Sequence, residues 1–302
     1  MNPSSRLVST IAAFSSVLLF STGGLCIKRL PLTALDVAGF RSLVAALFLG
    51  TILFLRQEPF SFRGIHTSGW IASVCYAAMV TAFVFATKLT TAANAIFLQY
   101  TMPAWVLLGG AWWLKERITA GRVITIGLCL AGMALFFCGD LRPTDWLGNL
   151  VALFSGVTFA ALTLLLRKDR DRRPLDSVFL GNVITAVVLT PIAFWVDPDG
   201  ARLVSSTVGF LLLWLGVFQM GVAYLCFVRA LKGLPAIEVA ILSLVEPVLN
   251  PTWVYLGMGE IPSLWAGIGG GVILLSVILK TLLSGENETY DPCGANCGPT
   301  GG

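Results

Sequence analysis

The chain has 302 residues, of which 56% are hydrophobic and only 12% are charged. A soluble domain carries about 25% charged residues, so this composition excludes an ordinary soluble protein. The net charge of +4 does not indicate nucleic-acid binding, because the cations lie in short links between long apolar runs.

Ten apolar segments follow one another along the chain, and each approaches the roughly 20 residues that a helix needs to cross a bilayer. The first is too long for the apolar region of a cleaved signal peptide, which favours a membrane span. The fold class expected is an all-α integral membrane protein with ten transmembrane helices. They are predicted at 7–27, 36–55, 69–89, 92–114, 121–138, 146–166, 177–196, 207–229, 236–257 and 263–283.

The positive charges predict the orientation of these spans. Lys and Arg number 14 at the N-terminus, in the even-numbered links and at the C-terminal end, against five in the odd-numbered links. Because cytoplasmic loops carry the excess of cations, both termini are expected in the cytoplasm and the chain in the cell (inner) membrane. Residues 284–302 are expected to form a disordered cytoplasmic tail, in which Cys293 and Cys297 are only a weak signal for a metal site or a disulfide.

The sequence repeats itself. An offset of 144 residues brings two intramembrane prolines and two span-ending glutamates into register, and an offset of 140 aligns the first spans of each half. The pairs are Pro103 with Pro247, Glu116 with Glu260, and Lys28 with Lys168. Two repeats of five spans, 7–138 and 146–283, must enter the membrane from opposite sides because five is odd. This is the inverted-repeat plan of secondary transporters.

Several motifs resemble the EamA-type carriers of the drug/metabolite transporter superfamily. They are Phe40-Arg41-Ser42-Leu43 in the second span, Ala92, Pro103 and Leu114-Lys115-Glu116-Arg117 around the fourth, and Ala236, Glu246-Pro247 and Gly257-Met258-Gly259-Glu260 around the ninth. The resemblance covers about residues 7 to 283. It implies a 5+5 inverted fold with a central cavity, and transport of small metabolites, amino acids or drugs, often outward.

Glu246 is the strongest candidate for a functional residue. An ionised carboxylate in mid-span costs roughly 2.5–3.5 kcal/mol on insertion scales, so it should face a watery cavity or a partner, or stay protonated. Helical spacing places Ser243, Asn250 and Trp253 on the same face. Two readings stay open: a cavity residue that binds substrate or exchanges protons, and a structural glutamate bonded between helices.

Prolines predict broken backbone beside this stripe. Pro247 and Pro251 lack an N–H and leave carbonyls of the ninth span without helical partners, and Pro103 does the same for the carbonyl of Gln99 in the fourth. These three prolines are the predicted hinges. Met102 stands where the other half has Glu246, so the two halves are not chemically equivalent.

The remaining candidates have structural alternatives. Arg41 either snorkels to the membrane interface or binds a carboxylate-bearing substrate at the cavity mouth. Tyr76, Tyr100 and Tyr224 either wall a cavity or pack between helices. Glu116 and Glu260 are expected to cap span ends, and Glu238 to favour a helix start.

The expected function is secondary transport, in the outward direction, of small metabolites by alternating access between the two halves. No ATP-binding, nucleophile or metal-ligand motif occurs in the sequence, so no catalytic residue, metal or cofactor is expected. The predicted partners are a small-molecule substrate and the lipid bilayer, not nucleic acid. Proton coupling and a homodimer stay open. The alternatives are a facilitative exchanger, a channel-like pore and, last, an intramembrane enzyme.

Overall fold

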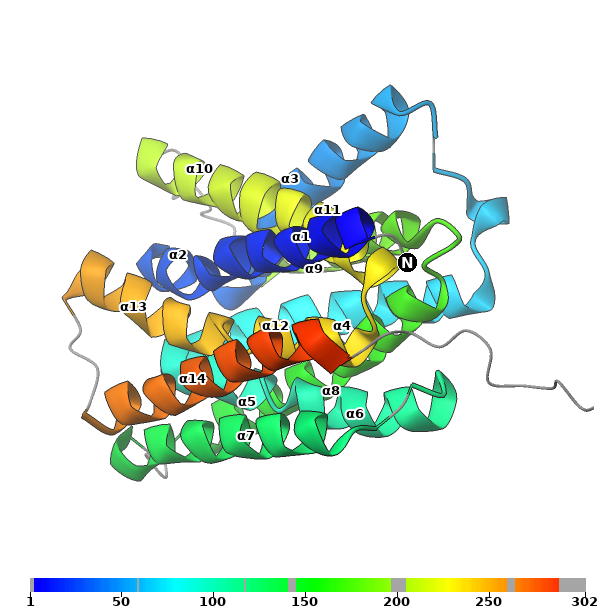
Figure 1. Cartoon of the computed structure of the whole chain (residues 1–302). Helices are drawn as coiled ribbons and strands as arrows, with labels where there is room; N and C mark the ends of the chain where they lie inside the picture. The colour runs from blue at the N-terminus through cyan, green and yellow to red at the C-terminus, as the bar shows by residue number, and fades with distance from the viewer. Residues whose placement is uncertain are drawn as a thin grey trace, which may run out of the picture.

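The computed structural model describes residues 3–58, 60–116, 118–140, 145–196, 205–259 and 264–287, and within them all regular structure is helical. Figure 1 shows the helices lying roughly along one direction, with the N-terminus at one end of the bundle. The first half of the chain forms α1 (Pro3–Ser21), α2 (Gly23–Arg29), α3 (Ala34–Leu55), the short 3-10 turn η1 (Phe62–Gly64), α4 (Thr67–Leu89), α5 (Ala92–Gln99), α6 (Met102–Trp113) and α7 (Ala120–Asp140).

The second half of the chain is also helical. It forms α8 (Trp146–Lys168), α9 (Pro174–Val196), α10 (Ser206–Leu213), the π-helical stretch η4 (Trp214–Val222), α11 (Ala223–Gly233), α12 (Ala236–Ser243), α13 (Glu246–Met258) and α14 (Leu264–Asn287). Residues 288–302, which include the predicted tail with Cys293 and Cys297, lie outside the described residues, as does Glu260.

Seven helical segments in the described part of the chain are long and apolar enough to cross a membrane. Two of them join elements across a break, since α1 and α2 act as one segment, as do α12 and α13. They are Ser5–Arg29, Ala34–Leu55, Thr67–Leu89, Trp146–Lys168, Pro174–Val196, Ser206–Gly233 and Ala236–Met258. Shorter apolar helices lie within α7 and α14, at Ala120–Leu135 and Gly267–Leu279. The count of ten spans therefore stays a prediction.

The outer surface of the bundle is apolar. Large hydrophobic side chains are exposed along most helices, among them Phe54, Leu108, Val187 and Leu275. A soluble monomer rarely exposes such continuous apolar surface, whereas lipid covers it at no cost. Tryptophans are exposed near helix ends, where their amphipathic rings suit the membrane interface: Trp112, Trp146 and Trp195. The chain is a multi-pass membrane protein.

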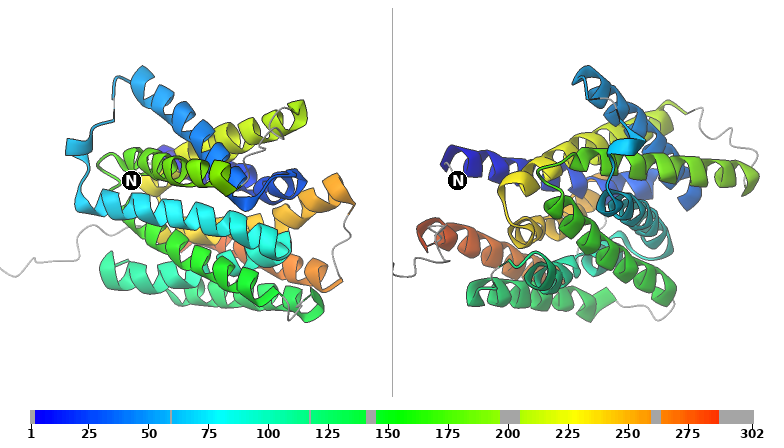
Figure 2. Two further views of the ribbon diagram at one scale, coloured as in Figure 1. Left: turned by 180° about the vertical axis from the view of Figure 1, so that it is seen from behind. Right: turned by 90° about the vertical axis from the view of Figure 1, so that its right-hand side faces the viewer.

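Helices of each half pack on helices of the other half, and the contacts of the two halves correspond. The first-half helix α4 packs on α8 and α9, and correspondingly the segment η4–α11 of the second half packs on α1 and α3. Helices that occupy equivalent places in the two halves also pack on each other, α3 with α9 and α7 with α14. Figures 1 and 2 show α7 and α14 side by side at one edge of the bundle.

Short polar motifs define several helix ends. Thr33 and Asp36 form a reciprocal capping box at the start of α3, and Thr91 accepts the Asn94 N–H at the start of α5. The start of α12 is capped from the other half of the chain. There the Glu116 carboxylate accepts the N–H groups of Ala236 at 2.9 Å and Ile237 at 3.3 Å. Glu116 thus caps a helix, as predicted, but the helix is not its own.

Candidate functional site

Two broken helices meet at the centre of the bundle. The break between α5 and α6 follows Gln99, and the break between α12 and α13 follows Ser243, in register at the 144-residue offset. Pro103 is the second residue of α6 and Pro247 the second of α13, whereas Pro251 lies inside α13. The first two predicted hinges therefore stand where the chain is broken, and proline is tolerated there because the first N–H groups of a helix have no helical partner.

A small cavity lies beside these breaks, with a volume of about 30 Å³. It has room for only one or two water molecules. Its polar lining consists of Arg41 from α3, Gln99 from α5, Gln219 from η4, Tyr224 from α11 and Glu246 from α13. Its apolar lining comes from α1, α4, α8 and η4: Phe20, Met79, Val80, Phe83, Phe159 and Met220.

Glu246 and Tyr100 join the two breaks. The Tyr100 hydroxyl, from the turn between α5 and α6, donates a short hydrogen bond to Oε2 of Glu246 at the start of α13. Glu246 is 5% exposed and Tyr100 is fully buried. The carboxyl lies at the amino end of α13, where the helix dipole favours negative charge. Glu246 thus lines the cavity and also bonds between two helices, so both interpretations of this residue stay open.

Arg41 lies deeper than the sequence suggested. Its side chain is 1% exposed and lines the central cavity, so it neither snorkels to the interface nor stands at a cavity mouth. Nη2 donates to the Val80 carbonyl at 2.8 Å, while Nε and Nη1 have no hydrogen-bond partner among the described residues. The reason is that α3 packs against α4, α9 and η4, and the Arg41 side chain reaches Val80 of α4. A buried guanidinium with unused donors suits an anionic group of a solute.

Gln99 binds across the two halves of the chain. Its Nε2 donates to Oγ of Ser155 at 2.7 Å, and that hydroxyl donates to the Met79 carbonyl at 3.1 Å. Gln99 is 5% exposed and Ser155 is fully buried. This chain of bonds fixes the side chain of Gln99, which lines the cavity.

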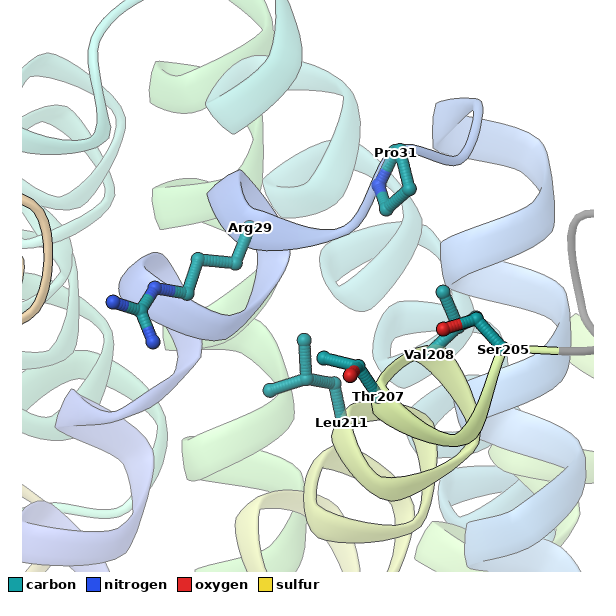
Figure 3. A pocket seen from close by; sticks show the side chains of 6 residues that line it. All are labelled: Arg29, Pro31, Ser205, Thr207, Val208 and Leu211. Atoms are coloured by element: carbon teal, nitrogen blue, oxygen red, sulfur yellow. The ribbon is translucent and has the colours of Figure 1, made fainter.

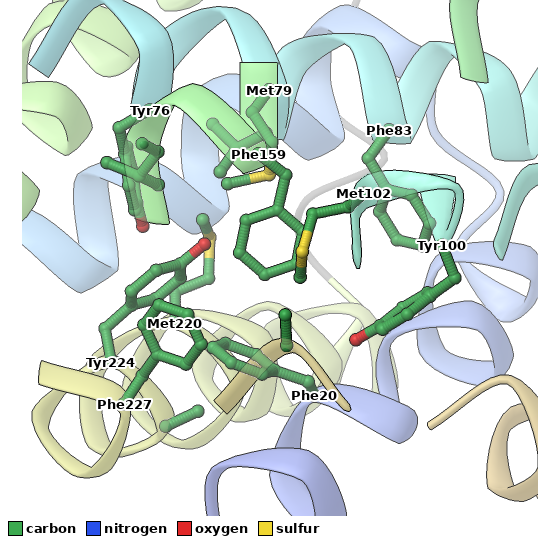
Figure 4. Packing of buried hydrophobic residues seen from close by; sticks show 14 of the residues in the cluster. Phe20, Tyr76, Met79, Phe83, Tyr100, Met102, Phe159, Met220, Tyr224 and Phe227 are labelled. Atoms are coloured by element: carbon green, nitrogen blue, oxygen red, sulfur yellow. The ribbon is translucent and has the colours of Figure 1, made fainter. Parts of the chain in front are cut away.

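Aromatic rings fill the space around the cavity, as Figure 4 shows. Tyr224 stacks edge-on against Tyr76 and Phe20, with ring centroids 4.8 and 4.9 Å apart. The Tyr76 hydroxyl accepts from Nδ2 of Asn182 at 2.8 Å. Tyr224 lines the cavity, while Tyr76 supports it from behind.

The rest of the predicted stripe on the ninth span does not line this cavity. The Ser243 hydroxyl donates to the Val239 carbonyl at 2.9 Å, and Trp253 Nε1 donates to the Ser21 hydroxyl at 2.9 Å. Asn250 is fully buried against α2. The reason is that α13 turns its later residues toward α1 and α2, away from the centre.

Gln219 is the cavity residue that sequence reasoning missed. It is 7% exposed and lies in the π-helical stretch η4. A wider turn of this kind often occurs at functional sites, because it shifts the side chains that follow. The signal was a lone amide in an otherwise apolar span, flanked by Phe218 and Met220.

A wider hollow of about 530 Å³ opens where α2 faces α10, as Figure 3 shows. Its lining includes Arg29, Ser205, Thr207 and Leu211. The Arg29 guanidinium also donates to the Gly257 carbonyl at the end of α13. The described lining has one charged group and is apart from the central cavity.

The chain is similar to known proteins over most of its length. The model of the EamA-like transporter family matches residues 7–138 and again residues 146–282. The chain is similar to the uncharacterized transporter YwfM of Bacillus subtilis (strain 168), with 29% identity over 82% of this chain and 84% of that one. It is also similar to the uncharacterized transporter YxxF of the same bacterium, with 24% identity over 91% of this chain and 89% of that one.

A solved crystal structure has the same fold. It superposes with a TM-score of 0.76 over 91% of this chain and 98% of that chain, at 19% sequence identity. The two matched segments of the family model together span most of the 302 residues. The chain therefore belongs, as its motifs predicted, to the EamA-like transporter family.

Proposed function

We propose that this membrane transporter is a secondary carrier that exports small metabolites, such as amino acids or drug-like solutes, by alternating access. The observation that carries the proposal is the small cavity, lined by five polar side chains, at the meeting point of two broken helices. Secondary transporters bind their substrates in such places, near the middle of the membrane.

The corresponding helix contacts of the two halves support two inverted repeats. By their order in the two halves, α4 corresponds to η4–α11, α8 to α1, and α9 to α3. The contacts of α4 with α8 and α9 therefore correspond to those of η4–α11 with α1 and α3. The breaks also correspond, since Ala92–Gln99 and Ala236–Ser243 have equal length and lie 144 residues apart. Two units related in this way are able to rock against each other around a central site.

The size of the cavity favours a carrier over a pore. A small-molecule site usually measures about 300–1,000 Å³, and the central cavity measures about 30 Å³. The bundle is therefore closed around the site in this conformation. A solute enters only when helices separate, so transport requires a conformational cycle.

Glu246 is the proposed proton carrier. Among the described residues that line the cavity it is the only acidic one. When the cavity opens to water, this carboxyl is able to exchange a proton with the solution on that side of the membrane. Binding of a proton and binding of a solute would then alternate at one site, with Arg41 taking an anionic group of the solute.

A flux assay tests this function. Candidate solutes are first identified by the thermal stabilisation that they give the purified protein, screened over amino acids and other small metabolites. Export of such a solute from proteoliposomes should saturate and should rise with an imposed pH gradient. Glu246→Gln should remove the response to the gradient and leave solute exchange intact.

Three outcomes would count against the proposal. An unchanged response to the gradient in Glu246→Gln would remove Glu246 from coupling. Flux that does not saturate, and that shows no counterflow, would indicate a pore. Saturable counterflow without any response to pH would indicate a facilitative exchanger.

A further inference from the structure

The helix that begins the chain is broken beside the central cavity. The Ser21 hydroxyl donates to the Leu18 carbonyl and the Thr22 hydroxyl to the Leu19 carbonyl, each within 2.8 Å. Such local bonds satisfy carbonyls that the helix would otherwise use, and they allow the chain to turn. The short helix α2, Gly23–Arg29, begins directly after the break.

Two amide side chains press against the first residues of α2. A Cβ atom on Gly24 would lie 2.3 Å from Asn250 Oδ1 and 2.8 Å from its Cγ. Because Cγ is itself too close, rotating the amide alone makes no room, and a larger residue at position 24 would displace the Asn250 side chain. A Cβ atom on Gly23 would lie 3.0 Å from Gln219 Nε2. α2 thus closes directly onto Asn250 and Gln219.

These amides are buried with unused hydrogen-bonding groups. Asn250 is fully buried, and neither its Oδ1 nor its Nδ2 has a partner in the described ranges of the chain. Gln219 is 7% exposed, and its Oε1 likewise has no partner there. Leaving such groups unpaired is costly, so their retention calls for an explanation in another state of the molecule.

The fold does not require polar groups at these places. At the 144-residue offset the counterparts of Gln219 and Asn250 are Cys75 and Val106, and at the 140-residue offset Thr22 corresponds to Leu162. Leu162 lies in α8, which runs unbroken from Trp146 to Lys168. The same packing is achieved in the other half by apolar side chains and a continuous helix.

We propose that α2 is a lid over a second polar subsite, formed by Asn250 and Gln219, which binds an uncharged hydrogen-bonding group of the solute when the chain bends at Thr22–Gly24. The proposal rests on the carrier function proposed above. It adds a subsite to the central cavity, because Gln219 lines that cavity and Asn250 lies one helical turn after Glu246.

The chemistry of the subsite selects its ligand. An amide donates and accepts hydrogen bonds without carrying charge. It therefore suits a carboxamide or hydroxyl group of the solute, whereas Arg41 and Glu246 suit charged groups. Three hydrogen bonds between α2 or its end and neighbouring helices keep the lid closed: Lys28 to the Thr90 carbonyl, Arg29 to the Gly257 carbonyl, and Lys88 to the Leu30 carbonyl.

The native Cys26 reports on the lid, because it lies in α2 and is 7% exposed. The test uses the full chain in membranes, with Ala at the other six cysteines, and follows the labelling rate of Cys26 with N-ethylmaleimide. Gly24→Ala should raise this rate about tenfold, since the new methyl group opposes closure onto Asn250. When Asn250→Ala is combined with Gly24→Ala, slow labelling of Cys26 should be restored.

Gly209→Ala is the matched control. Gly209 lies in α10, and a Cβ atom there would meet nothing within 4 Å, so the labelling rate should not change. An effect of Gly24→Ala that persists when Asn250 is also Ala would overturn the proposal, as would no effect at all.

A second variant covers the case in which Gly24→Ala does not fold. Asn250→Val replaces the unpaired amide by the apolar side chain that the other half has at this place, Val106. The closed lid should then become more stable, and labelling of Cys26 should fall about tenfold. An unchanged rate would overturn the lid. The labelling assays require no transport, so they separate failure of the lid from failure of the carrier, which the flux assay decides.

Discussion

Tyr100 and Glu246 join the two broken helices by a side-chain hydrogen bond. Sequence reasoning identified both, because a carboxylate in mid-span and a tyrosine beside a proline break are conspicuous in an apolar chain. It did not identify their contact, since nothing in the sequence places position 100 opposite position 246. That contact depends on how the two halves pack.

Tyr100→Phe should lower the stability of the protein by about 1–3 kcal/mol, because it leaves the buried carboxyl of Glu246 without its donor. Thermal unfolding in detergent measures the change. The matched control is Tyr255→Phe. Because Tyr255 is 46% exposed, this substitution should lower the stability of the protein only slightly. Equal effects at the two positions would show that the bond to Glu246 contributes nothing.

Arg41→Met should have opposite effects on stability and transport. The substitution removes a buried charge with two unused donors, so the free energy of unfolding should rise by about 1–3 kcal/mol. Export of any solute with an anionic group should be lost. Thermal unfolding and flux measure the two effects, with the exposed Arg56→Met as control. A destabilised variant that still transports would contradict the placement of Arg41 at the solute.

Elements were easier to predict than their irregularities. The apolar runs and Pro103 and Pro247 indicated where the fourth and ninth spans lie and why they break. The break at Thr22 has no proline, and it arises from hydroxyl bonds to nearby carbonyls together with Gly23 and Gly24. The π-helical turn in η4 has no sequence signature of its own, so the position of Gln219 could not be inferred.

Glu116 shows how one element depends on another. Its carboxylate caps α12 and lies 3.7 Å from Nε of Arg167, at the end of α8. Glu116→Gln should therefore lower stability by about 1–2 kcal/mol, through a weaker cap and a lost ion pair. Thermal unfolding should show that Glu116→Gln lowers the stability less in a chain that carries Arg167→Met than in the native chain. Glu58→Gln, at an exposed position, is the control.

At the scale of the whole molecule the charge distribution makes a prediction about sidedness. In a chain without native cysteines, Ser205→Cys should react with a membrane-impermeant maleimide added to intact cells, whereas Ser61→Cys should react only after permeabilisation. Both positions are exposed, so burial cannot explain a difference. Reaction of both from the same side would contradict ten spans with cytoplasmic termini.

The two halves differ where it matters for energy coupling, since Met102 occupies the place that Glu246 occupies in the other half. If Glu246 carries the proton, as proposed above, this single carboxyl limits the exchange to one proton per turnover. When the solute has no net charge, each cycle then moves one elementary charge across the membrane. Voltage becomes a driving force worth about 2.3 kcal/mol per 100 mV, which holds a concentration ratio of roughly fiftyfold.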